Sequence, residues 1–248
     1  MHLLKSAQAR FLGLLAALWL GVFFITRSIL LLTHLSEAQL SPGGVLRLYG
    51  EGVIYDVSFL LYVLAPLALY LLLCPDWLWR KRWHLRVLQV AMTIGVFLML
   101  FTAVAEWLFW DEFGVRFNFI AVDYLVYSDE VINNILESYP VYPLLAALTV
   151  IAGITTAVLQ PRVRRIAAAP LLSWPQRGVS LAGAVTTIAL SVVIIGQNFP
   201  RSAGGNAYQN ELASNGPYQF LCRVPEQRTG LHAVLPAVAR GHRRQYPT

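Results

Sequence analysis

Three ionisable side chains lie inside otherwise apolar stretches of the chain: Arg27, Asp56 and Glu106. An ionised group in hydrocarbon is costly, so such residues usually pair with one another or line a polar cavity. A guanidinium and carboxylates at one depth can form a structural ion pair, or they can bind the headgroup of an anionic lipid. The sequence therefore predicts a polar cluster with alternative roles: a structural pair between Arg27 and Asp56, an Arg27 that snorkels to the interface, or a lipid-headgroup site.

The remaining polar residues show no pattern typical of catalysis. The sequence contains no glycine-rich phosphate loop, CxxC pair, HExxH or GxSxG, and its histidines are scattered without ligand spacing. Asp123, Asp129 and Glu130 could serve as metal ligands, but acids at a helix start are ordinarily solvated caps. We expect no catalytic, cofactor-binding or metal-binding residue in this chain.

Five apolar stretches must position the three charged residues. Each is near the ~20 residues that a helix needs to cross ~30 Å of hydrocarbon at ~1.5 Å per residue. Hydrophobic residues make up 57% of the 248 residues and charged residues 13%. The pI near 9.5 comes from basic residues that cap the stretches, which argues against nucleic acid as a partner. The predicted fold class is an all-α polytopic membrane protein with transmembrane helices over 11–33, 53–73, 87–109, 141–159 and 179–197.

Loop charges predict the orientation of these helices. The connections at 80–86 and 162–177 are basic, whereas the connection at 111–137 is acidic apart from Arg116. By the positive-inside rule, the N-terminus and the two basic connections are cytoplasmic, and the chain after Gln197 is extracytoplasmic. We expect a multi-pass protein of a bacterial plasma (inner) membrane, with Arg27, Asp56 and Glu106 near its outer face.

The acidic connection also carries an amphipathic pattern. Phe117, Ile120, Tyr124 and Tyr127 are spaced to share one helix face, and Ser128 looks like the N-cap of a second apolar stripe that runs to Pro140. The region 117–138 is therefore predicted to form amphipathic helices on the outer leaflet.

Two stretches resemble a known family. EWLFWDEFGVRFNFIAVDYLVYSDEVINNILESYPV (106–141) resembles the membrane part of bacterial lipoteichoic-acid-synthase-like proteins, and NAYQNELASNGPYQF (206–220) resembles the linker that leaves their fifth span. These proteins are phosphoglycerol or phosphoethanolamine transferases of the sulfatase and alkaline phosphatase superfamily. The resemblance implies a five-helix anchor followed by an extracytoplasmic catalytic domain with a Thr nucleophile and a divalent metal, usually manganese.

The chain departs from that family pattern after Phe220. The nucleophile and the metal ligands of the family are absent, so no active-site residue is carried over and no cofactor is expected in this chain. One possible coding of Leu221–Ala237, shifted by one nucleotide, reads CAAFRNNELDYTRFYPP, which resembles the family's continuation. Residues 221–248 are therefore expected to be a frameshifted, disordered tail.

These observations divide the chain into a cytoplasmic N-terminus (1–10), a five-helix membrane domain (11–197), an extracytoplasmic linker (198–220) and the tail. The leading hypothesis is the N-terminal membrane anchor of a sulfatase-family phosphoglycerol or phosphoethanolamine transferase of the cell envelope, catalytically inactive as written. The alternatives are a free-standing five-helix module that binds anionic lipid or a separate catalytic subunit, and a small transporter. The expected partners are membrane lipids, including anionic phospholipid headgroups.

Overall fold

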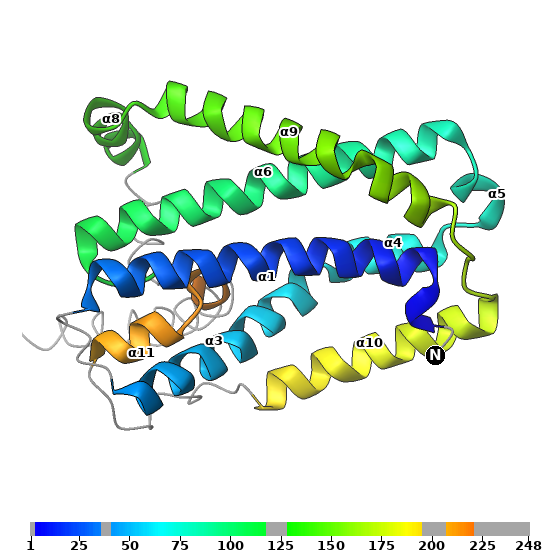
Figure 1. The fold of residues 1–248 in the computed structure, drawn as a ribbon, viewed down its shortest axis with the longest axis horizontal. Helices are drawn as coiled ribbons and strands as arrows, with labels where there is room; N and C mark the ends of the chain where they lie inside the picture. Colours follow the sequence, from blue (N-terminus) through cyan, green and yellow to red (C-terminus); the bar gives the residue numbers. More distant parts are fainter. Residues whose placement is uncertain (1–2, 36–40, 118–127, 195–206, 221–248) are drawn as a thin grey trace, which may run out of the picture.

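A computed structural model describes residues 3–35, 41–117, 128–194 and 207–220 of the chain (Figure 1). The described residues form helices joined by short connections, and no strand occurs among them. Four helices are long and apolar enough to cross a membrane: α1 (Ala7–Thr33), α6 (Arg82–Phe113), α9 (Val141–Ala167) and α10 (Trp174–Ile194). A fifth crossing is formed if α3 (Pro42–Val63) and α4 (Ala65–Leu73) together make one span. The predicted all-α polytopic membrane fold is confirmed.

The second predicted span differs from expectation in its shape. The apolar pattern predicted one helix over 53–73, but the helix begins at Pro42 and bends by 47° between α3 and α4. Pro66 explains the break, because proline has no N–H to donate and its ring clashes with the carbonyl four residues earlier. The Leu64 N–H still donates to the Leu60 carbonyl at 2.9 Å, so the chain changes direction with only a local loss of helical bonding.

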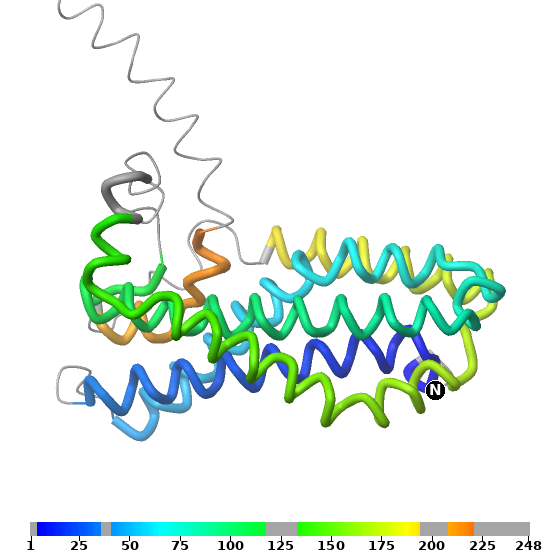
Figure 2. The backbone as a smooth tube through the Cα atoms, turned by 90° about the horizontal axis from the view of Figure 1, so that it is seen from above, coloured from blue at the N-terminus to red at the C-terminus, as the bar shows by residue number. Residues whose placement is uncertain are grey.

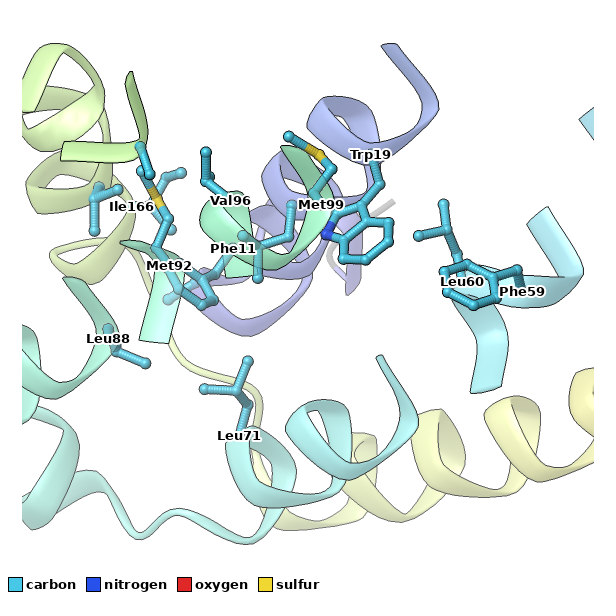
Figure 3. Packing of buried hydrophobic residues seen from close by; sticks show 14 of the residues in the cluster. Phe11, Trp19, Phe59, Leu60, Leu71, Leu88, Met92, Val96, Met99 and Ile166 are labelled. Atoms are coloured by element: carbon cyan, nitrogen blue, oxygen red, sulfur yellow. The ribbon is translucent and has the colours of Figure 1, made fainter. Parts of the chain in front are cut away.

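The core of the bundle lies around α1, which contacts α3, α4, α6 and α9 (Figure 1). One side of α1 presents Phe11, Leu15, Trp19 and Phe23 at helical spacing, and all four side chains are buried. Figure 3 shows Phe11 and Trp19 among buried side chains from the other helices, including Phe59, Leu71 and Met92. Many apolar side chains on α9 and α10 point outward instead, as expected where hydrocarbon covers the bundle.

Short helices lie at both ends of the bundle (Figures 1 and 2). We call the end where α1 begins the amino end; η1 (Leu3–Lys5) and α5 (Asp76–Trp79) lie there. We call the opposite end the α11 end; α8 (Ser128–Ser138) and α11 (Ala207–Ala213) lie there. Helix α8 begins at the residue predicted to start it, whereas residues 118–127 of the predicted amphipathic region lie outside the described residues. Helix α11 falls inside the region predicted as a linker, and the predicted tail lies outside the described residues.

Candidate functional site: a buried charge cluster at the α11 end

Arg27 of α1 and Asp56 of α3 form a buried ion pair. The two Nη atoms of Arg27 donate to the two Oδ atoms of Asp56 at 2.7 and 2.8 Å, and each residue is at most 2% exposed. Gly52 lies one helical turn before Asp56, and a Cβ atom at that position would collide with the Arg27 guanidinium. The glycine therefore makes room for this fork-to-fork geometry, which is the strongest arrangement of an Arg–carboxylate pair.

Arg27 also binds the chain that follows the last membrane helix. Its Nε donates to the Leu212 carbonyl at 3.1 Å, and its Nη2 donates to the Ser214 carbonyl at 3.3 Å. Both carbonyls lie at the C-terminal end of α11. The last carbonyls of a helix lack intrahelical donors and carry partial negative charge, so a guanidinium is a favourable partner for them.

Asn215 connects the same ion pair to the turn after α11. Its Nδ2 donates to Asp56 Oδ1 at 2.7 Å, and its Oδ1 accepts the Tyr218 N–H at 2.8 Å. The side-chain amide thus binds the carboxylate through its nitrogen, and its oxygen caps the helical turn that begins at Gly216.

Glu106 of α6 forms a second buried pair with Arg116. Arg116 Nε donates to Glu106 Oε1 at 2.7 Å and Nη2 donates to Oε2 at 3.1 Å, and both residues are fully buried. Helix α6 ends at Gly114, whose φ of 65° is the left-handed conformation that glycine adopts at helix C-termini. This turn brings Arg116 back alongside the last turns of α6, where it reaches Glu106.

The second pair also binds the chain after α11. Arg116 Nη1 donates to the Ser214 carbonyl, the same oxygen that accepts from Arg27, and the Gly216 N–H donates to Glu106 Oε1 at 3.1 Å. A Cβ atom at Gly216 would collide with Glu106 Oε1 and would lie 2.9 Å from the Phe117 backbone nitrogen. Only a residue without a side chain fits this contact.

We call Arg27, Asp56, Glu106 and Arg116 the charge cluster, and residues 207–220 the exit segment. The structure brings together all three side chains that the sequence predicted, and it contains the predicted pair between Arg27 and Asp56. Sequence reasoning missed Arg116 as the partner of Glu106, and it missed the exit segment as the group that joins the two pairs. The available signal was that Arg116 is the one basic residue in an acidic connection.

Residues of the chain itself supply the hydrogen-bond partners of the charge cluster. Burying two ions is offset only when geometry is good and the remaining donors and acceptors are bonded, which the exit segment achieves here. The hollow beside the exit segment, lined by Gly44, Arg47 and Gln209 among others, has a volume of about 10 Å³. That volume is roughly one water-sized probe. The cluster therefore has the properties of the predicted structural ion pair, and lipid-headgroup binding by it stays a prediction.

A third buried arginine, Arg177, lies at the amino end. Arg177 donates to the Leu172 and Cys74 carbonyls at 2.9 and 2.7 Å, contacts the Asp76 carboxylate, and stacks its guanidinium 4.6 Å from the Trp174 ring centroid. It thereby closes the C-terminal end of α4 against the start of α10. Burial raises the pKa of the neighbouring Cys74 thiol, while Arg177 opposes that shift. Arg177 was predicted only as one charge of the basic connection at 162–177.

The described residues include no group of three or more His, Cys, Asp and Glu side chains arranged to hold a metal ion. Asp123 lies outside the described residues, and the side chains of Asp129 and Glu130 are likewise not described. The acids of the charge cluster are each bonded to an arginine. The donors present in the described chain thus do not fit a manganese site.

Comparison with known proteins identifies no relative of this chain. No protein-family model, curated protein or solved structure matches the chain. The family resemblance of the stretches at 106–141 and 206–220 therefore stays a prediction.

Proposed function

We propose that this chain is the membrane anchor of a cell-envelope transferase of the phosphoglycerol or phosphoethanolamine type, and that its charge cluster fixes the exit segment at the outer membrane face. The bundle supplies the anchor, and the exit segment carries the chain toward a catalytic domain of the sulfatase superfamily. That domain would transfer a phosphoglycerol-type group from a lipid onto a glycan or lipid. Residues 1–248 supply position and orientation to the reaction.

One observation carries the proposal. The contacting residues of the two stretches that resemble the transferase family lie 98 and 110 positions apart in sequence, yet they meet in the charge cluster. Glu106 and Arg116 from the first stretch bind Ser214 and Gly216 from the second. A linker that only spans distance needs no such contacts, whereas an anchor that orients the next domain does.

The contacts give the exit segment a defined position relative to the membrane helices. Tyr218 lies against Tyr55 and Tyr62 of α3, with ring centroids 5.5 and 6.2 Å apart. Leu212 and Ala213 are buried against Leu30, Leu48 and Trp110. Apolar packing and ion-pair contacts together hold the segment from Tyr208 to Tyr218, so a domain that follows it would keep a fixed height and direction above the bundle.

The catalytic metal of the proposed transferase would be held outside the described part of this chain, because the donors in that part do not fit it. Phosphoryl-type transfer needs a positioned nucleophile and stabilisation of the developing charge. In this proposal those groups come from a domain in the same protein or from a separate catalytic subunit. The second option matches the free-standing module that the sequence also allows.

The coding DNA tests the proposal. Deleting or inserting one nucleotide near the Leu221 codon should extend the product far beyond Thr248, and the extended protein should release glycerol phosphate from phosphatidylglycerol vesicles in a metal-dependent manner. The unmodified chain, purified in the same way, is the control and should be inactive. An early stop in both shifted frames would contradict the fused arrangement and favour the separate subunit. Metal-dependent turnover by the unmodified chain would contradict the assignment of catalysis to another domain.

A further inference from the structure

A cavity opens at the amino end, between the start of α1 and the connection from α9 to α10. Its volume is about 300 Å³, and Lys5, Arg10, Ser6 and Gln176 are among the residues that line it. This volume lies at the lower end of the ~300–1,000 Å³ typical of small-molecule sites. The cavity is at the opposite end of the bundle from the charge cluster and takes no part in holding the exit segment.

The charge around this cavity has one sign. Lys5 and Arg10 are exposed on its wall, and neither forms an ion pair with a described residue. The two chain segments whose residues line the cavity, 5–10 and 170–176, contain no Asp or Glu. Unopposed cations around a concave site raise the local concentration of anions.

Neutral donors lie beside the same wall. Gln8 is 1% exposed, and its Oε1 accepts the N–H of Leu172, a residue that lines the cavity, at 3.3 Å. The Nε2 of Gln8 has no hydrogen-bond partner among the described residues. A buried donor left without an acceptor costs ~1–3 kcal/mol. The side chains that line the cavity include the cationic donors Lys5 and Arg10 and no carboxylate, whereas a cation site would need acceptors.

We propose that this cavity binds a phosphate group, supplied either by the headgroup of an anionic phospholipid or by free phosphate. Arginine and lysine are the residues that bind phosphate oxygens most strongly, and Arg10 and Lys5 present both types at one opening. Pro170 and Leu171 complete the lining with apolar surface, against which the glycerol part of a lipid can pack. The site is independent of the transferase proposal, since it shares no residue with the charge cluster or the exit segment.

Native mass spectrometry of the full chain, released from a neutral detergent, tests the site because the added mass identifies the ligand. The probes are a short-chain phosphatidic acid, inorganic phosphate, and a short-chain phosphatidylcholine as the zwitterionic reference. The test variant is Lys5→Gln with Arg10→Gln. The matched control is Lys81→Gln with Arg82→Gln, which removes two exposed basic residues at the same end that do not line the cavity.

The native chain should carry one added phosphatidic acid or one phosphate in preference to phosphatidylcholine. The loss of two charge-assisted contacts should weaken that binding by roughly tenfold or more in the Lys5/Arg10 variant, with the control within about twofold of the native chain. An adduct of phosphatidic acid without an adduct of inorganic phosphate identifies the lipid headgroup as the source of the phosphate group. If inorganic phosphate occupies the site as fully as phosphatidic acid does, the free ion is the source. Equal loss in both variants, or no preference over phosphatidylcholine, would overturn the proposal.

Discussion

Arg27 and Arg116 donate to the same oxygen, the backbone carbonyl of Ser214. The two guanidinium groups come from different elements, one from α1 and one from the turn after α6, and each is paired with its own carboxylate. The two positive charges can lie close together because each is paired with a carboxylate and both donate to the same carbonyl oxygen. The exit segment is therefore part of the buried structure of the membrane domain.

The pair between Arg27 and Asp56 should show strong coupling. Removing one partner leaves an uncompensated buried charge, so Arg27→Met or Asp56→Asn alone should lower the free energy of unfolding by about 3–5 kcal/mol. The double variant should lose less than the sum of the two single losses. Denaturant unfolding in one detergent, analysed as a double-mutant cycle, measures the difference. If the loss in the double variant equalled the sum of the two single losses, the two side chains would not be energetically coupled.

Gly216 should tolerate no side chain. In Gly216→Ala the Cβ atom meets Glu106 Oε1 and the Phe117 backbone, so the exit segment must shift, at a cost of about 1–3 kcal/mol. Gly153→Ala in α9 is the matched control, because a Cβ atom there meets no other atom within 4 Å. Thermal unfolding of both variants compares them, and equal melting temperatures would count against the close contact.

Reporter fusions should find the two ends of the bundle on opposite sides of the membrane. The basic residues gather at the amino end, so a reporter that is active only outside the cytoplasm should be silent after Arg165 and active after Phe220. Fusions to both positions, with matched expression measured by immunoblot, make the comparison. Activity after Arg165 together with silence after Phe220 would reverse the orientation.

Cys74 should be slow to react at neutral pH. Burial raises the pKa of its thiol above the ordinary value of 9.0, so the reactive thiolate is scarce in the folded chain. Because the folded pKa is the higher one, the thiol contributes stability below the unfolded pKa and loses it as the pH rises through the folded pKa. Alkylation of a Cys222→Ser background, followed by mass spectrometry between pH 7 and pH 10, should show labelling only at the alkaline end or after unfolding. Rapid labelling at pH 7 would contradict the burial of Cys74.

The long helices could be predicted from the sequence because hydrocarbon imposes length and apolarity on every span. The extension of α3 back to Pro42 could not, since residues 42–52 are only partly apolar and α3 packs against α11, which is distant in sequence. Pro66, in contrast, was a local signal for the bend. The pair between Arg27 and Asp56 was predictable from depth and sign of charge. The pair between Glu106 and Arg116 depends on the left-handed turn at Gly114, and the shared Ser214 carbonyl depends on the return of a segment 187 residues from Arg27, which no local pattern encodes.

Hydrogen exchange of the exit segment tests the central claim most directly. The amides of Gly216 and Tyr218 donate to Glu106 and Asn215, so peptides covering 208–220 should exchange as slowly as peptides from the ends of α1 and α6. In Glu106→Gln, which leaves Arg116 without its charged partner, the same peptides should exchange at least about tenfold faster, a change that corresponds to ~1.4 kcal/mol or more. Peptides from α9, which makes no hydrogen bond or ion pair to the cluster, should be unchanged. Exchange of the native exit segment at the rate of an unstructured peptide would contradict the account.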